Sequence, residues 1–379
     1  MKITSVDIIQ QTEGTNLPRD YAWILIHTDE GITGLGELNR RPNEIIAVIR
    51  DWAPHLLVGQ DPRHIERIWE TLFSYATPYG NTGAARRAIS AIDMALWDIA
   101  GKALGAPVVQ LLGGACRDRV PVYSTGGIGG STREEVHKNV RQMMELGWRA
   151  AKTAPFQLSK ESHDPSQQFL WRYASPKEVA RGVQIMAWTR EAAGDEFDVG
   201  IDHHPLWDVH GATRVIRAME PFNLMFFECA MFEDSLEPWA ALARDCRVPL
   251  MCGEYSQSRY QLLPFIERNL VSIVNPDLAW VGGITEIKRI GIIAKTHGVA
   301  VAPHDSGPVT TYARCHVMAN MSNAFYMELS SATRGMWDAV TEKLEIVDSS
   351  LPVPTKPGLS VELNPEMIEA SPIESKVIS

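Results

Sequence analysis

The sequence is poor in the features that mark secreted, membrane-bound and nucleic-acid-binding proteins. Its five cysteines are odd in number and scattered without C-x-x-C spacing, which is typical of reduced thiols in a reducing compartment. No apolar run approaches the length that crosses a bilayer, and residues 1–14 lack the long apolar stretch of a secretory signal. Basic residues number 36 against 46 acidic ones, and the formal charge of −10 argues against nucleic acid as the main partner. We therefore expect a cytoplasmic protein that binds neither nucleic acid nor a membrane.

The composition that remains is that of a globular protein. Of the 379 residues, 45% are hydrophobic and 22% are charged, so a sizeable core can be buried. The length exceeds one ordinary domain but fits a large barrel with a smaller partner.

The N-terminal part has the pattern of three strands followed by helices. Alternating or apolar runs predict a hairpin-connected meander over residues 2–11, 23–28 and 31–37. Helical periodicity follows over residues 43–53, 65–73 and 83–104, and the last helix should end at Gly105 and Pro107. We expect these elements to form an α+β unit over residues 1–115.

From residue 116 onward, short β-rich runs alternate with helical stretches. Eight such runs occur, over residues 120–124, 150–152, 199–202, 225–228, 250–254, 273–277, 299–303 and 326–329. Eight strands alternating with helices predict a parallel sheet closed into a (β/α)₈ barrel over residues 116–340. In the tail, residues 341–379, the proline-rich stretch 344–363 looks extended, and we expect it to fold back onto the N-terminal meander.

Three acidic residues end three successive strands of this barrel. Asp202, Glu228 and Glu254 are each separated by 26 residues, about one β/α unit, so their side chains should converge at the C-terminal rim. Each follows an apolar run, where an unpaired carboxylate would be costly. A single acid at a strand end is more often a salt-bridge partner or a helix cap. Three in register predict a divalent cation with oxygen ligands, Mg²⁺.

Two histidines lie at strand ends on the same rim. His204 stands two residues beyond Asp202, so both side chains should leave the same side of an extended chain. His304 follows the seventh strand and Asp277 ends the sixth, and a carboxylate beside an imidazole fixes its tautomer and raises its basicity. One such histidine alone is more often structural, but two of them facing each other across a metal predict a general acid/base pair.

These motifs resemble those of the enolase superfamily, in its mandelate racemase branch. The resemblance spans nearly the whole chain, through TGAARRAISAIDMALWDIAGKALGAPVVQLLGG before the barrel, AAKTA at the second strand, GID, FFE and CGE at the predicted metal ligands, NPDLAWVGGITE at the sixth strand and PH at the seventh. It implies an α/β fold, a modified (β/α)₈ TIM-type barrel with an α+β capping domain formed by the N-terminal region and the C-terminal tail. It also implies bound Mg²⁺, a small-molecule carboxylate substrate and a homo-oligomer, from dimer to octamer.

The resemblance further suggests a role for each residue at the rim. The metal ligands correspond to Asp202, Glu228 and Glu254, a His–Asp dyad to His304 and Asp277, the acid that hydrogen-bonds the enediolate to Glu328, and the first lysine of a K-x-K pair to Lys152. The sequence departs from the family pattern at two positions. Ala154 replaces the second lysine, and Cys229 stands where a second acid commonly follows the fourth-strand ligand.

The loss of the second lysine leaves one face of the α-carbon without its usual base. Asp-x-His on the third strand resembles the acid-sugar dehydratases for galactonate and mannonate, and His204 can supply the missing group. The implied reaction converts an aldonate or aldarate to a 2-keto-3-deoxy acid through an enediolate. One of His204 and His304 would take the α-proton and the other would protonate the leaving 3-hydroxyl, while Lys152 and Glu328 steady the enediolate oxygens.

Substrate specificity should reside in loops above the rim, over residues 15–21, 74–82 and 155–176. The last of these is unusually long, and its aromatic residues favour an ordered lid over a disordered segment. Mannonate-type enzymes are similar in placing a Tyr–Arg pair after the second strand, so Tyr173, beside Arg172, is a candidate base. The other interpretation of Tyr173 is an aromatic plug that packs the lid.

Three other functions are consistent with parts of the pattern. An epimerase or racemase could use Lys152 and His304 as opposed bases, although the missing second lysine disfavours it. A lactonising enzyme would need paired lysines across the barrel, and Gly282 and Gly283 stand where one would be. A barrel that only binds a metal and a carboxylate, without turnover, should have a damaged acid/base set, and the set predicted here is intact.

Overall fold

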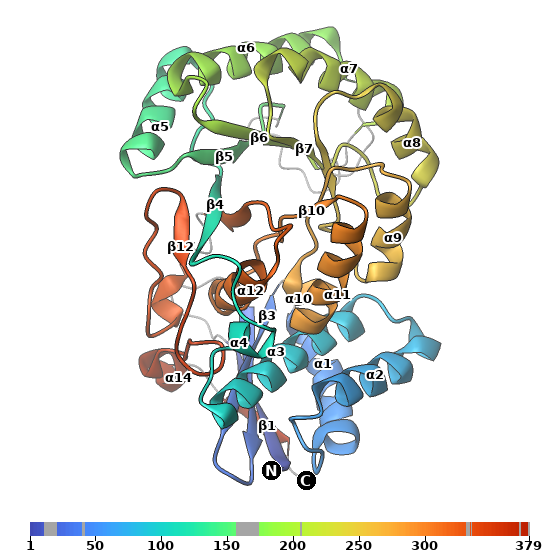
Figure 1. Cartoon of the computed structure of the whole chain (residues 1–379), viewed down its shortest axis with the longest axis vertical. Helices are drawn as coiled ribbons and strands as arrows, with labels where there is room; N and C mark the ends of the chain where they lie inside the picture. The colour runs from blue at the N-terminus through green and yellow to red at the C-terminus, as the bar shows by residue number, and fades with distance from the viewer. Residues whose placement is uncertain are drawn as a thin grey trace.

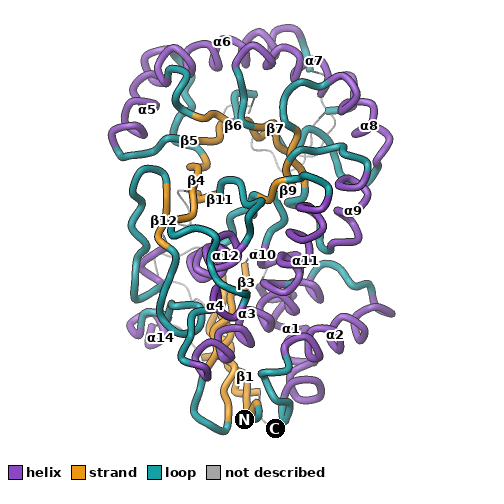
Figure 2. Tube along the Cα trace, in the orientation of Figure 1, coloured by secondary structure: helices purple, strands orange, loops and turns teal. Residues whose placement is uncertain are grey.

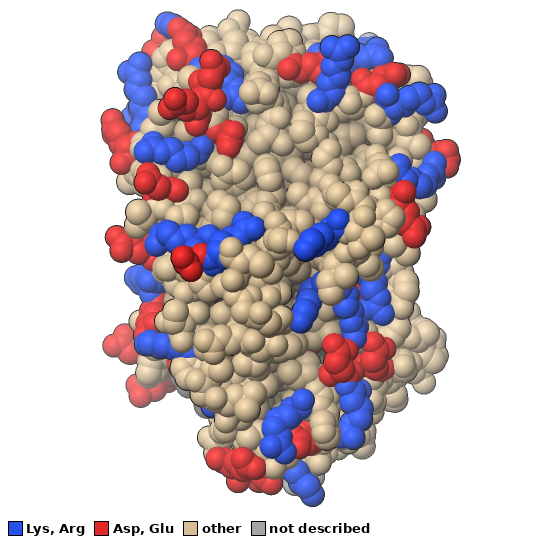
Figure 3. All heavy atoms as spheres, viewed as in Figure 1, with Lys and Arg blue, Asp and Glu red and all other residues tan. Residues whose placement is uncertain are grey.

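The computed structural model describes residues 1–10, 21–39, 42–156, 174–204, 207–330, 334, 336–370 and 373–377. The chain forms a barrel of strands surrounded by helices, with a second unit of strands and helices packed beneath it (Figures 1 and 2). Among the described residues, no helix is both long and apolar enough to span a membrane. The face drawn in Figure 3 carries both basic and acidic side chains, and several of the basic ones lie near the middle of the face.

The capping domain is built on an antiparallel sheet, as the sequence predicts. Strands β1 (Ile3–Gln10), β2 (Tyr21–Thr28) and β3 (Thr33–Asn39) form the meander. Three helices follow, α1 (Pro42–Trp52), α2 (Ile65–Ala76) and α3 (Ala84–Leu104). Helix α3 lies close against β3, because a Cβ at Gly34 or Gly36 would come 2.1 Å from a carbonyl oxygen of that helix. Glycine is therefore required for this approach.

The barrel contains eight parallel strands, in agreement with the prediction. They are β4 (Arg119–Thr125), β5 (Ala150–Thr153), β6 (Asp198–Asp202), β7 (Phe226–Glu228), β8 (Leu250–Cys252), β9 (Ile273–Val274), β10 (Ala300–Val301) and β11 (Met327–Ser330). From β4 to β10 each strand pairs with the next one in the sequence, and β11 pairs with β4. A parallel bridge between Val301 and Ala324 joins the remaining edge. The helices outside are α5 (Arg133–Glu145), α6 (Pro176–Ala193), α7 (Val209–Met219), α8 (Leu236–Asp245), α9 (Arg259–Glu267), α11 (Gly283–Thr296) and α12 (Pro308–Asn320).

A layer of apolar side chains fills the barrel below the candidate site. It consists of Tyr123, Ala150, Phe226, Met251, Ile273 and Ala302. Several of these residues stand two positions before a polar residue at the strand end, as Ala150 does before Lys152 and Phe226 before Glu228. Since side chains two apart on a strand share a face, the apolar layer forms the floor of the rim site.

The tail joins the meander as expected, but it does so through its last strand and not through the extended stretch 344–363. The stretch 344–363 does not join the meander: β12 (Ser350–Pro352) pairs antiparallel with β4, and Leu359 donates its backbone N–H to Asp98 of α3. The meander gains its fourth strand later, where β13 (Ile373–Val377) pairs with β1. We retain residues 1–115, 116–340 and 341–379 as the proposed division of the chain.

Candidate active site

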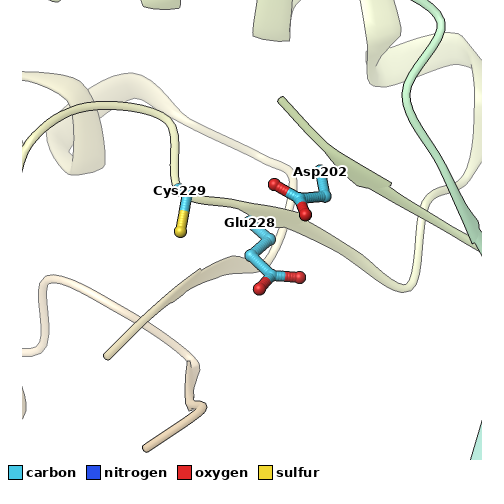
Figure 4. A group of neighbouring side chains, drawn as sticks. All are labelled: Asp202, Glu228 and Cys229. Atoms are coloured by element: carbon cyan, nitrogen blue, oxygen red, sulfur yellow. The ribbon is translucent and has the colours of Figure 1, made fainter. Parts of the chain in front are cut away.

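Two of the predicted metal ligands lie side by side at the barrel rim. Asp202 ends β6 and Glu228 ends β7, and the two residues are paired in register. Together with Cys229 they form a buried group whose ligand atoms all lie within 4.8 Å of one another (Figure 4). Burial raises the pKa of Glu228 well above its ordinary value, although the ammonium of Lys152 opposes this shift. A site that concentrates buried carboxylate oxygens in this way fits a hard divalent cation such as Mg²⁺.

Lys152 supplies a counter-charge to three of the buried carboxylates. Its Nζ lies 3.2 Å from Oδ2 of Asp202, 2.7 Å from Oε2 of Glu228 and 2.8 Å from Oε1 of Glu328. Burial on its own would lower the pKa of Lys152, but these three carboxylates raise it well above its ordinary value. The residue is therefore held as an ammonium ion at the centre of the site.

Glu254 lies beside this group but faces the predicted dyad. Its Oε1 is 3.3 Å from Nε2 of His304, and its Oε2 is 4.0 Å from Sγ of Cys229. Strand β8 ends at Cys252, two residues before the predicted end, because the chain turns at Gly253 with a φ of +126°. Glu254 is therefore positioned by a turn, and the partly buried Glu233 holds that turn by accepting the N–H of Gly253 at 2.7 Å.

The structure brings His304 and Asp277 together. Nδ1 of His304 lies 2.8 Å from Oδ2 of Asp277, and both side chains are buried. Oδ1 of Asp277 accepts the backbone N–H of Ala279 at 2.8 Å, as the N-cap of the short helix α10 (Leu278–Val281), and the hydroxyl of Ser306 donates to the same oxygen. Burial would lower the pKa of His304, but Glu254, Glu328 and Asp277 raise it to about 10.

His204 lies at the outer edge of the site. Its side chain is 49% exposed, and its Nδ1 is 3.8 Å from Oδ1 of Asp202. The expectation of an extended chain here is wrong, because His204 adopts a left-handed conformation with φ of +56°. The carboxylate of Asp202 stabilises this turn by accepting the backbone N–H of His204 at 3.0 Å. The neighbouring His203 points elsewhere and stacks on Trp207, with ring centroids 3.9 Å apart.

Glu328 lies on β11 and accepts contacts from several hydrogen-bond donors. Lys152 and the hydroxyl of Thr125 contact its Oε1, and the backbone N–H of Asp305 donates to its Oε2 at 3.1 Å. Burial on its own would raise the pKa of the Glu328 carboxyl. The positive charges of Lys152 and His304 instead hold this pKa below its usual range. Glu328 is therefore an ionised acceptor at the rim.

Sequence reasoning missed a further polar residue in contact with the carboxylates. Asn275 is fully buried and donates its Nδ2 to Oε1 of Glu228 at 2.6 Å. It stands two residues after Ile273, which lies in the apolar layer, so strand alternation could have placed it at the rim. Of the residues expected in the loops, Tyr173 lies outside the described part of the chain, as do most of residues 155–176 and 15–21.

Comparison with known proteins identifies the family. Residues 4–113 match the mandelate racemase/muconate lactonizing enzyme N-terminal domain, and residues 135–367 match the enolase C-terminal domain-like family. The D-galactonate dehydratase of Pectobacterium atrosepticum is 32% identical, over 97% of this chain and 94% of its own. That of Xanthomonas oryzae pv. oryzae is 33% identical, over 92% and 90%.

Solved structures agree with this assignment. A member of the enolase superfamily from Salmonella Typhimurium superposes with a TM-score of 0.90 and 27% identity, over 98% of each chain. An enolase of the mandelate racemase subgroup from Agrobacterium tumefaciens superposes with a TM-score of 0.85 and 29% identity, over 98% of this chain and 97% of its own. The protein therefore belongs to the mandelate racemase/muconate lactonizing enzyme family of the enolase superfamily.

Proposed function

We propose that this protein is a Mg²⁺-dependent dehydratase that converts a sugar acid, an aldonate or aldarate, to a 2-keto-3-deoxy acid. The observation that carries the proposal is the buried His304–Asp277 dyad, whose Nε2 faces the carboxylate of Glu254 at 3.3 Å at the mouth of the barrel. A buried base beside a candidate cation site suits removal of a proton α to a carboxylate. The similarity to two D-galactonate dehydratases along most of the chain supports the same reaction class.

Three carboxylates are proposed to hold the cation: Asp202, Glu228 and Glu254. When bound, Mg²⁺ would neutralise the substrate carboxylate and lower the energy of the enediolate dianion. Glu254 lies between Cys229 and His304, so as a ligand it would connect the cation to the dyad.

The dyad is proposed to handle one of the two protons of the reaction. Asp277 accepts a hydrogen bond from Nδ1 of His304, which leaves Nε2 to exchange a proton with the substrate. In the first step the base takes the proton from C2, and the electron pair of that bond moves toward the carboxylate. In the second step the C3–O bond breaks, the hydroxyl leaves as water with a proton from the acid, and the resulting enol becomes the 2-keto product. His204, half-exposed near Asp202, is proposed as the partner of His304 in these transfers, with Tyr173 as the alternative base.

Lys152 is proposed to orient the substrate carboxylate, and Glu328 is proposed to accept a hydrogen bond from another group of the substrate. The ammonium of Lys152 favours the additional negative charge that develops on that carboxylate. The ionised Glu328 accepts hydrogen bonds, so it can accept one from a hydroxyl group of the substrate.

The test is a screen of the purified protein with Mg²⁺ against C4–C6 aldonic and aldaric acids. The readout is 2-keto acid, measured by semicarbazone absorbance, and the expected result is product from at least one acid. If no 2-keto acid forms but deuterium exchanges at the α-carbon of any acid in the library, the result would favour an epimerase. If both assays are negative, the result would favour a phosphorylated or non-sugar substrate, or a barrel that binds a metal and a carboxylate without turnover.

The epimerase is the weaker candidate because Ala154 stands where the second lysine of the K-x-K pair would supply a base. Lys152, the remaining lysine, contacts three carboxylates, two of which are proposed to hold the cation. Two partners are proposed for this chain: a small-molecule carboxylate as its substrate, and further copies of itself in a homo-oligomer. Size-exclusion chromatography with light scattering tests the proposed range from dimer to octamer.

A further inference from the structure

We propose that Asn39, a residue of the capping sheet, is a positioning residue that holds the His304–Asp277 dyad through Trp280 and Ser306. The inference rests on the proposed function for the role of the dyad itself. It assigns to the capping domain a part in the acid/base chemistry of the barrel, in addition to any contact with substrate.

Asn39 connects two segments of the barrel with one side chain. It ends β3, is 2% exposed, and reaches residues more than 240 positions later in the sequence. Its Oδ1 accepts the indole N–H of Trp280 at 2.7 Å, and its Nδ2 donates to the backbone carbonyl of Ser306 at 2.9 Å. A primary amide carries both an acceptor and donors, so asparagine can satisfy an indole and a carbonyl at once.

The two contacts of Asn39 lead to the two members of the dyad. The ring of Trp280 lies against the imidazole of His304, with centroids 5.5 Å apart and planes tilted by 41°. The hydroxyl of Ser306 donates to Oδ1 of Asp277, the oxygen that does not contact His304. Asn39 therefore supports the imidazole through one neighbour and the carboxylate through the other.

Helix α3 of the capping domain supports the same tryptophan. The guanidinium of Arg87 lies 4.4 Å from the centroid of the Trp280 ring, a cation–π contact. The hydroxyl oxygen of Ser90 accepts the N–H of Gly282 at 2.8 Å, in the turn that follows α10. Trp280 is thus held at its N–H, at its ring and at the end of its helix by residues of the capping domain.

Loss of Asn39 should disturb the dyad more than the fold. Replacement by leucine keeps the approximate volume but leaves the indole N–H of Trp280 and the carbonyl of Ser306 buried without this partner. Both groups must then move to find other partners, and a proton-transfer group displaced by about 1 Å can lose on the order of 10²-fold in rate.

The experiment compares Asn39→Leu and Trp280→Phe with a matched control. Trp97→Phe removes a similar indole hydrogen bond between the domains, from Trp97 of α3 to Thr285 at 2.9 Å, and does not touch the dyad. With the sugar acid found in the screen, kcat should fall by about 10–100-fold in the two test variants, with KM and Mg²⁺ affinity unchanged and a larger primary deuterium isotope effect at C2. The control should retain the kcat of the unmodified protein. An equal loss in all three variants, or unchanged kcat in the test variants, would overturn the proposal.

A second measurement separates this inference from the proposed function. If no sugar acid is turned over, the positioning role can still be measured from the low-field ¹H NMR signal of the proton between Nδ1 of His304 and Asp277. His304→Asn identifies that signal by its disappearance. It should shift or disappear in Asn39→Leu and Trp280→Phe and stay in place in Trp97→Phe. The same signal in all of these variants except His304→Asn would show that Asn39 does not position the dyad.

Discussion

Nζ of Lys152 on β5 lies 2.7 Å from Oε2 of Glu228 on β7, and both side chains are buried at the rim of the barrel. The same ammonium contacts Asp202 and Glu328, so a single positive charge faces three buried carboxylates. Removing it would leave these carboxylates without their main counter-charge, which is costly in a site of low dielectric.

Lys152→Met should therefore destabilise the metal-free protein. We expect a loss of about 3–5 kcal/mol in the free energy of unfolding, the range for a broken buried ion pair. Urea denaturation in EDTA measures it. Added Mg²⁺ should restore part of the loss, because a cation can replace the missing charge, and an equal loss with and without Mg²⁺ would contradict a cation site here.

Mg²⁺ should stabilise the unmodified protein against unfolding. At a Mg²⁺ concentration of 100 times Kd, the gain is about 2.7 kcal/mol, seen as a rise in Tm. Asp202→Asn should reduce this gain, because it removes a charged ligand from the group formed with Glu228. Glu267→Gln, on the outer helix α9, serves as the charge-matched control and should respond to Mg²⁺ like the unmodified protein.

His304→Asn should abolish turnover and spare metal binding. The loss of a general acid/base group lowers kcat by about 10²–10⁴-fold. Isothermal titration with Mg²⁺ should give an affinity close to that of the unmodified protein, since the imidazole is not a proposed ligand. Retained turnover would remove His304 from the catalytic role.

His316 should make the protein less stable in acid. This residue of α12 is buried, and burial lowers its pKa from 6.5 to about 4. The unfolded chain then binds the proton more readily than the folded chain between these two values. Stability is fully present above pH 6.5 and is lost as the pH falls toward 4, by about 3 kcal/mol as an order of magnitude.

The His316 contribution is measured as a difference between two proteins. His316→Gln cannot take up this proton, so its free energy of unfolding should fall less between pH 7 and pH 4.5 than that of the unmodified protein. Chemical denaturation at both pH values provides the comparison. Equal decreases in the two proteins would contradict the assignment.

Gly36→Ala should weaken the packing of the capping domain. A Cβ at this position would lie 2.1 Å from the carbonyl oxygen of Ala91 in α3, so the helix must move. We expect a loss of about 1–3 kcal/mol or more, the range for overpacking. Gly129→Ala is the control, because its Cβ would meet only Thr153 Oγ1 at 3.7 Å, and thermal unfolding should separate the two variants.

Much of the fold was predictable because it depends on local periodicity. The alternation of short apolar runs with helical stretches predicts the eight strands, and their observed bounds differ from the expected ones by a few residues. The tail was less predictable. The pairing of Ser350–Pro352 with β4, and of Ile373–Val377 with β1, depends on long-range contacts that leave little local pattern.

The candidate site, like the fold, was predictable from the sequence only in part. The placement of Asp202 and Glu228 at neighbouring strand ends follows from strand order alone, because parallel strands bring their C-terminal ends to one rim. The left-handed turn at His204 and the turn at Gly253 that directs Glu254 toward His304 are not visible in the spacing of the residues. Backbone turns beyond a strand end depend on tertiary hydrogen bonds, such as the one from Gly253 to Glu233.

The sequence by itself determined the order of the β/α units, the family and the set of acids and histidines that reach the rim, because residue type and period suffice for these. Only the tertiary structure decided which of these groups touch one another. Lys152 joins three carboxylates from different strands, and Asn39 of the capping sheet contacts Trp280 and Ser306, the neighbours of the dyad. Such contacts connect residues far apart in the chain, and their geometry is set by the packing of whole elements against each other.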